Sequence, residues 1–120
     1  MSDSDLTINC WILGDHYQHV FSVKISRNEN VVILKDAIKL ADEIALKDTD
    51  ACTLILYHVT IPYSLQLAEH AATSDKLKLN AFDKLSKVFA NGSLDTHVNV
   101  VVEIPQAYGA WVYVFLWSLR

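Results

Sequence analysis

Residues 6–26 read LTINCWILGDHYQHVFSVKIS, two apolar runs separated by a polar break. Every second residue of the first run is apolar, which is the period-2 pattern of a strand with one buried face; these residues are Leu6, Ile8, Cys10 and Ile12, with Trp11 on the opposite face. Gly14-Asp15 interrupts the pattern, and a polar loop continues to His19. The alternation then resumes at Phe21, Val23 and Ile25. The stretch therefore predicts a β-hairpin.

After the hairpin the apolar period changes from two to between three and four. The residues at this spacing would share one face of a helix; they are Val31, Leu34, Ile38, Ala41 and Ala45. Either Asn28 or Asn30 can cap its first turn, because an Asn side chain accepts a hydrogen bond from a backbone N–H there. This helix has the length needed to cover one face of a small sheet.

Two further strands are predicted at residues 53–61 and 97–104. The first is apolar on both faces, which favours a central strand or one with an apolar outer face, and Pro62 would end it. The second alternates through Val98, Val100, Val102 and Ile104. Between these strands, short helices are predicted from the spacing of two apolar groups: Leu65, Leu67 and Ala71, then Phe82, Leu85, Val88 and Phe89 before Asn91-Gly92.

The element order ββαβ, short helices, β predicts an α+β fold of the β-grasp (ubiquitin-like) class. Its mixed sheet would carry one main helix, with short extra helices, and a helical crossover can place the third strand parallel to the first. The core is expected to include Phe21, Leu34, Ile38 and Val100. A chain of 120 residues suits one domain. We expect a disordered N-terminus at 1–5, the domain at 6–105, and an apolar aromatic tail at 106–120.

Composition restricts the possible partners. With 52% hydrophobic and 20% charged residues the chain should fold. The net charge of −4 argues against nucleic acid as a partner of this domain, because nucleic-acid binders are normally basic. The N-terminal residues MSDSD are not a classical signal peptide. We also expect no transmembrane segment, because no apolar run reaches the roughly 18 residues that spanning requires.

The residue types of a catalytic or metal centre do not converge in the sequence. His16 and His19 have Asp15 as the only nearby carboxylate, so solvated loop histidines are favoured over a metal site. His58 or His97 could pair with a cysteine thiol, but no local motif supports this pairing. The three glycines lie too far apart for a phosphate-binding loop. We therefore expect no catalytic residues, no metal and no cofactor, and so not an enzyme.

The two cysteines do not form a disulfide framework. Cys10 and Cys52 both lie beside or inside predicted strands, where a free cysteine usually behaves as a small buried hydrophobe. A bridge joining neighbouring strands is the alternative, and it would require closely spaced Cα atoms.

The tail is unusually aromatic and carries no charge before Arg120. Its candidate interaction residues are Trp111, Tyr113, Phe115 and Trp117. Three interpretations stay open: an extra strand or helix docked on the sheet, an exposed segment that self-associates, or the end of a truncated or misread version of a longer protein.

Six short segments, in this order and spacing, resemble the N-terminal domain of Crinkler effectors, in its fungal form. They are residues 8–15, 20–25, 34–39, 54–62, 85–89 and 97–102. The resemblance implies a ubiquitin-like fold, secretion, and delivery into a host cell, with the host nucleus as a possible destination and host proteins as partners. The oomycete form of this domain carries a Leu-Phe-Leu-Ala-Lys motif linked to translocation. Residues 54–60 keep alternating leucines and an aromatic but not the Ala-Lys ending, which makes Leu54, Leu56 and Tyr57 the candidate translocation residues; a core strand explains the same pattern.

The sequence thus predicts a non-enzymatic Crinkler-type effector header, meaning an N-terminal delivery domain, that is secreted without a recognisable signal peptide and acts as a translocation and protein-interaction module. In Crinkler effectors this domain commonly precedes an effector domain, whereas fifteen residues follow Pro105 here, so we expect a delivery domain without its effector. The alternative is an intracellular β-grasp adaptor that binds a protein partner through a sheet edge or the aromatic tail.

Overall fold

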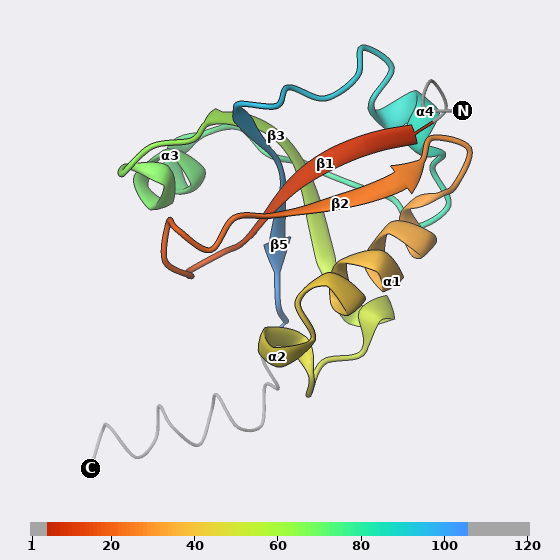
Figure 1. Cartoon of the computed structure of the whole chain (residues 1–120), viewed down its shortest axis with the longest axis horizontal. Helices are drawn as coiled ribbons and strands as arrows, with labels where there is room; N and C mark the ends of the chain where they lie inside the picture. The colour runs from red at the N-terminus through yellow and green to blue at the C-terminus, as the bar shows by residue number, and fades with distance from the viewer. Residues whose placement is uncertain (1–4, 106–120) are drawn as a thin grey trace.

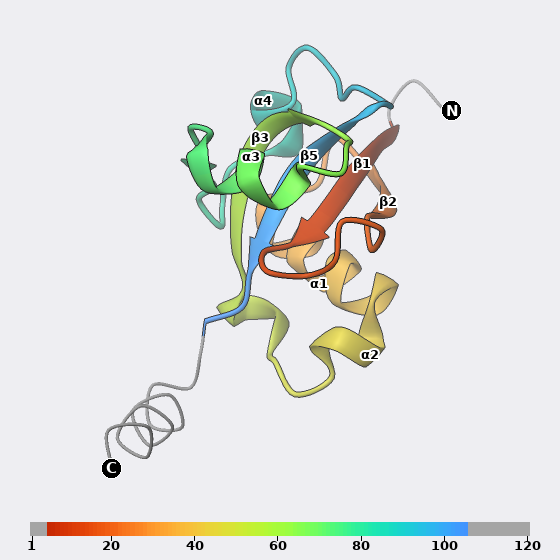
Figure 2. The ribbon, with the colours of Figure 1, turned by 90° about the vertical axis from the view of Figure 1, so that its left-hand side faces the viewer.

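The computed structural model describes residues 5–105, which form a mixed sheet with a helix on each face (Figures 1 and 2). The five strands are β1 (Asp5–Ile12), β2 (Phe21–Ser26), β3 (Ile55–Pro62), β4 (Leu77–Lys78) and β5 (His97–Glu103), in the sheet order β2-β1-β5-β3-β4. The helices are α1 (Val31–Ala41), α2 (Glu43–Leu46), the 3₁₀ turn η2 (Ala51–Thr53), α3 (Leu67–Thr73) and α4 (Leu85–Val88). The predicted α+β class is confirmed.

The predicted hairpin is present, with β1 and β2 antiparallel and Cys10 opposite Phe21. Gly14 occupies the loop between them with φ of +93°, a backbone region in which a side chain would be strained. The loop ends where Phe21 begins β2.

The prediction that the third strand runs parallel to the first is wrong. β5 is the strand that pairs in parallel with β1, with Cys10 opposite Val100, and β3 pairs antiparallel with β5. The crossover through α1 starts from β2, which is antiparallel to β1, so β2 and β3 are the two strands that share a direction. The last strand then inserts between the hairpin and β3.

Of the two predicted cap candidates, Asn30 and not Asn28 caps α1: the Oδ1 of Asn30 accepts from the N–H of Ile33 at 3.1 Å. The expected buried stripe is correct for Val31, Leu34 and Ile38. It is wrong for Ala41 and Ala45, which are exposed. The helix is interrupted at Asp42, and after this break Leu46 of α2 takes the next position in the core.

The larger core cluster lies between α1 and the sheet. Leu34, Ile38 and Val100 are completely buried in it, as expected, whereas Phe21 packs against it and is only partly buried. β1 contributes its alternate residues Leu6, Ile8, Cys10 and Ile12, confirming that this face of the strand is the buried one.

A second core cluster lies between the sheet and α3. Its buried residues are Trp11, Val59, Ile61, Leu67, Ala71, Val98 and Val101. This cluster explains why the strand at β3 is apolar on both faces. The side chain of Trp11 is completely buried here, and its Nε1–H donates to the carbonyl of His16 at 3.0 Å.

The two short helices are smaller than the apolar spacing predicts. α3 begins at Leu67, so Leu65 precedes the helix and is 71% exposed. α4 covers only Leu85–Val88, and Phe82 is 86% exposed. In both segments the chain around the helix is irregular, so the outermost apolar residue is turned away from the core.

Candidate functional site

The residues of the candidate translocation strand lie on two faces of the sheet. Leu54, directly before β3, and Leu56 are 1% and 0% exposed and belong to the cluster beneath α1. Tyr57 lies on the α3 face, and its hydroxyl donates to Oε1 of Glu103 at 2.9 Å. This hydrogen bond, together with burial, raises the pKa of Tyr57. A partner could reach both leucines only if the fold opened, whereas Tyr57 is partly accessible.

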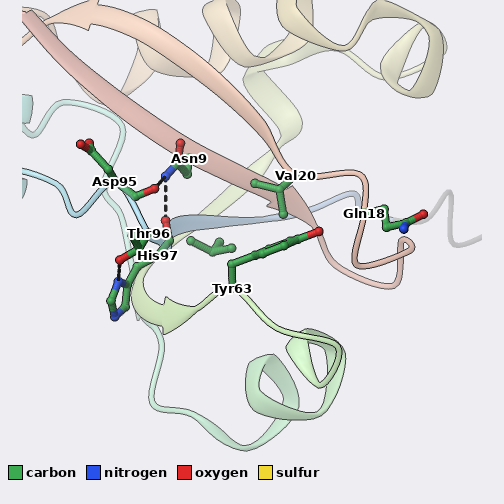
Figure 3. Close-up of a pocket in the computed structure, with 8 residues that line it drawn as sticks. Asn9, Gln18, Val20, Tyr63, Asp95, Thr96 and His97 are labelled. Atoms are coloured by element: carbon green, nitrogen blue, oxygen red, sulfur yellow. Dashed lines mark hydrogen bonds between the residues drawn. The ribbon is translucent and has the colours of Figure 1, made fainter.

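A cavity of about 430 Å³ lies on the same side of the sheet as α3 (Figure 3). Three loops meet there: the β1–β2 loop, the segment after β3, and the turn before β5. Its lining includes Asn9, Val20, Tyr63, Asp95, His97 and Val98. Tyr63 extends across the cavity towards the side that carries Val20 and Gln18 (Figure 3).

One wall of this cavity is fixed by the side chain of Asn9. Its Nδ2 donates to the carbonyls of Asp95 and His97 at 3.0 and 2.9 Å, and its Oδ1 accepts from the hydroxyl of Ser22 at 2.7 Å. The backbone N–H of Asn9 donates to Oδ1 of Asn99 at 2.8 Å. These bonds hold the turn before β5 against β1, so Asn9 shapes the cavity and has little capacity left for a ligand.

The polar groups at the edge of the cavity are arranged for binding a ligand and not for catalysis. His97 pairs its Nδ1 with the hydroxyl of its neighbour Thr96 at 2.9 Å. In Figure 3 the ring of His97 and the carboxylate of Asp95 both extend away from Tyr63. The apolar part of the lining consists of Val20, Val98 and the ring of Tyr63. A cavity lined by both apolar and polar groups can hold a side chain of a bound peptide.

The histidines of the β1–β2 loop interact with the loop itself. Nδ1 of His19 and Oδ1 of Asp15 are 2.8 Å apart, and the backbone N–H of His16 donates to the same oxygen at 2.8 Å. Partial burial raises the pKa of Asp15, but the bonds from His19 and His16 outweigh it, so this pKa lies below its ordinary value. Across residues 5–105, no three His, Cys, Asp or Glu side chains gather in a group that could hold a metal ion.

Both cysteines are free, and they differ in environment. Cys10 is completely buried, as expected, but the expectation that Cys52 is buried is wrong, because it is exposed within η2. Burial strongly raises the pKa of the Cys10 thiol, which makes it a poor nucleophile. His58 packs edge-on against Phe89 with ring centroids 4.7 Å apart, and burial lowers its pKa. Cys10 is therefore not placed as an activated thiol by this packing.

Trp111, Tyr113, Phe115 and Trp117 lie outside the described residues. Sequence reasoning missed the cavity, because its lining comes from β1, β5 and three loops that only the tertiary fold brings together. The one local signal was Asn99, a polar residue within the apolar run of residues 98–102. In the part of the chain that the structure describes, no helix has the length and apolarity to cross a membrane.

Comparison with known proteins identifies both a family and a fold. The family model described as Crinkler effector protein N-terminal domain matches residues 6–103. Among solved structures, the chain is similar to the solution structure of the C-terminal ubiquitin-like domain of mouse tubulin-specific chaperone e. The two are 12% identical with a TM-score of 0.56, covering 86% of this chain and 89% of that one, so the likeness concerns the fold alone. The predicted ubiquitin-like fold is thereby confirmed. No curated protein sequence matches the chain significantly.

Proposed function

Because this chain belongs to the family of Crinkler effector N-terminal domains, we propose that it is an effector delivery domain, secreted and carried into a host cell without catalysis of its own. The observation that carries the proposal is the extent of the family match, which covers residues 6–103 and so nearly all of the described domain. A ubiquitin-like fold is non-catalytic in kind, which supports a role in protein contact. We further propose that the domain is of the fungal type, and that its partners are host proteins.

Delivery is tested with the tagged full-length chain expressed in the producing organism. We expect tagged protein in the culture medium and, when host cells are present, inside them and in their nuclei. Retention of all the protein within the producing cell would overturn the effector proposal. It would favour the second candidate, an intracellular adaptor. β2 supports that alternative, because it is an edge strand of the sheet and an edge can pair with an extended peptide.

We propose that β3 contributes to translocation through Tyr57, with Leu54 and Leu56 supporting it from the core. Burial of the two leucines supports this division, because a receptor that meets the folded domain can contact only the partly exposed tyrosine. Tyr57→Ala should reduce uptake by host cells. Thr60→Ala, a change at an exposed residue of the same strand, is the control and should leave uptake unchanged. Equal uptake of both variants, at equal stability, would mean that β3 is only a core strand.

We also propose that residues 106–120 form an interaction segment through their aromatic side chains. Pull-down with the full-length chain is compared with a variant in which Trp111, Tyr113, Phe115 and Trp117 are replaced by serine. Partners, or a second copy of the chain, should be lost with the aromatic residues. Unchanged binding would assign the contacts to the domain itself.

A further inference from the structure

We propose that the apolar pocket beside Ile44 is the docking site for the chain's own aromatic segment, residues 106–120. The pocket has a volume of about 510 Å³ and lies between the β1–β2 loop and the α1–α2 junction. Three of its lining residues, Asp15, His19 and Asp42, are polar. The other five are apolar, namely Val20, Phe21, Ala41, Ile44 and Ala45. The inference rests on the proposed role of the tail as an interaction segment and names the surface that receives it.

The pocket presents apolar surface that the described residues leave uncovered. Ile44 is 89% exposed, the most exposed of the large apolar side chains between residues 5 and 105. Phe21 also lines the pocket, and it is only partly buried although its strand packs on the main core. Contiguous exposed apolar surface of this kind commonly marks a contact site, because covering it releases ordered water.

The tail begins within reach of this pocket. Cys10 is opposite both Phe21 and Val100, so Phe21 lies two strands, or about 10 Å, to the side of Val100 in the sheet. Pro105 is five residues beyond Val100, or roughly 16 Å further along the strand direction. The resulting separation of about 20 Å can be spanned by six extended residues, so aromatic residues from Trp111 onward can reach the pocket. β5 and α2 also end near the same, lower end of the molecule in both views (Figures 1 and 2).

The chemistry of the segment matches the pocket. Four of its large aromatic side chains, Trp111, Tyr113, Phe115 and Trp117, fall at alternate positions with apolar residues between them. It carries no charge before Arg120, so entry into the pocket desolvates no ionised group of this run. A tethered segment is held near its site at an effective concentration in the millimolar range, which favours the chain's own tail over a second copy in dilute solution.

Acrylamide quenching of tryptophan fluorescence in the full-length chain tests this docking. The chain has three tryptophans, and Trp11 is completely buried, so changes in quenching report on Trp111 and Trp117. Ile44→Asp places a charge at the pocket and should increase quenching and shift the emission to longer wavelength. Phe82→Asp is the matched control, because Phe82 is 86% exposed but lies by the start of α1, where the carbonyl of Ala81 accepts from Val32. It should leave both readings unchanged.

Equal quenching in the two variants would overturn the docking proposal. Protection that disappears on dilution of the unsubstituted protein would overturn the intramolecular occupant and assign the pocket to a second copy. If Ile44→Asp does not fold, the methyl resonances of Ile44 provide the second measurement. They should shift when Trp111, Tyr113, Phe115 and Trp117 are all replaced by serine, and unmoved resonances would contradict docking. Neither measurement depends on secretion. If the tail is protected but the chain is never delivered into host cells, the effector function is contradicted and the docking proposal is not.

Discussion

At the scale of single residues, the strands of this domain tolerate one buried polar side chain within the described range, that of Asn99. It is 3% exposed and accepts from the backbone N–H of Asn9 at 2.8 Å. Its Nδ2 donates to the carbonyl of Leu94, a longer contact of 3.4 Å. The side-chain amide thus accepts a hydrogen bond from β1 and donates one to the turn before β5. These two bonds allow a polar residue to remain buried inside an apolar strand.

We expect Asn99→Ala to destabilise the domain by about 1–3 kcal/mol, because it leaves the partly buried N–H of Asn9 without its acceptor. Urea unfolding followed by circular dichroism measures this change. Asn28→Ala, at an exposed position, is the control and should stay within about 0.5 kcal/mol of the unsubstituted protein. An equally small effect at Asn99 would show that water replaces the lost acceptor.

His58 should make the stability of the domain depend on pH. Burial lowers its pKa in the folded state below the unfolded value of about 6.5. The unfolded chain therefore binds the proton more readily, so this contribution to stability is complete above pH 6.5 and is lost as the pH falls through the folded pKa. His58→Leu should flatten the dependence between about pH 7 and 5 when unfolding free energies are measured at each pH.

Asp15 provides an internal contrast in the same experiment. Its pKa is lowered by its bonds to His19 and His16, so its contribution is present above about pH 3.9 and is lost only below that value. A slope between pH 7 and 5 that survives in the His58→Leu variant would have to be assigned to another group.

At the scale of elements, α3 allows the sheet to bury apolar side chains on both of its faces. Leu67 and Ala71 of α3 are completely buried, and they belong to the cluster that includes Trp11 of β1 and Val101 of β5. The main helix α1 covers the opposite face. A seven-residue helix therefore closes a face on which a fully buried tryptophan lies.

We expect Leu67→Ala to cost about 2–5 kcal/mol, because it opens a cavity against a buried cluster. Leu65→Ala is the matched control: the residue type is the same, but Leu65 is 71% exposed and should cost about 0.5 kcal/mol or less. Chemical unfolding measures both variants. Near-equal costs would mean that α3 contributes little to closing the face.

Local periodicity predicted the elements well where one residue pattern decided the outcome. The alternation in residues 6–12 and 21–25 identified the hairpin, and one of the two candidate caps, Asn30, is the residue that caps α1. Periodicity failed where the structure depends on contacts between residues far apart in the sequence. Periodicity identifies each strand but not its neighbours, so it could not show that β5 and not β3 lies beside β1. The spacing that groups Ala45 with Ile38 assumes one continuous helix and therefore misses the break at Asp42. The cavity lined by Asn9, Tyr63 and Asp95 could not be predicted, because its walls come from strands and loops far apart in sequence.

At the scale of the whole molecule, the central strands connect the two core clusters. β5 lies in the middle of the sheet and sends Val100 and Val102 to the α1 side, and Val98 and Val101 to the α3 side. β1 does the same through Cys10 and Trp11. Both clusters depend on the same strands, β1 and β5, so loss of packing in one cluster destabilises the other. This shared support favours cooperative unfolding of the described domain.

The two cysteines allow this cooperativity to be measured directly. Cys52 is exposed, whereas Cys10 is 0% exposed in β1 with a thiol pKa strongly raised by burial. A thiol reagent should modify Cys52 at once in the native protein, and Cys10 only as the domain unfolds, because the reactive thiolate of Cys10 is neither formed nor accessible before then. In a Cys52→Ser variant, the urea concentration at which Cys10 becomes reactive should equal the midpoint measured by circular dichroism. Reaction of Cys10 at lower urea would mean that β1 separates from the sheet before the rest of the domain unfolds, and that the two clusters are not one cooperative unit.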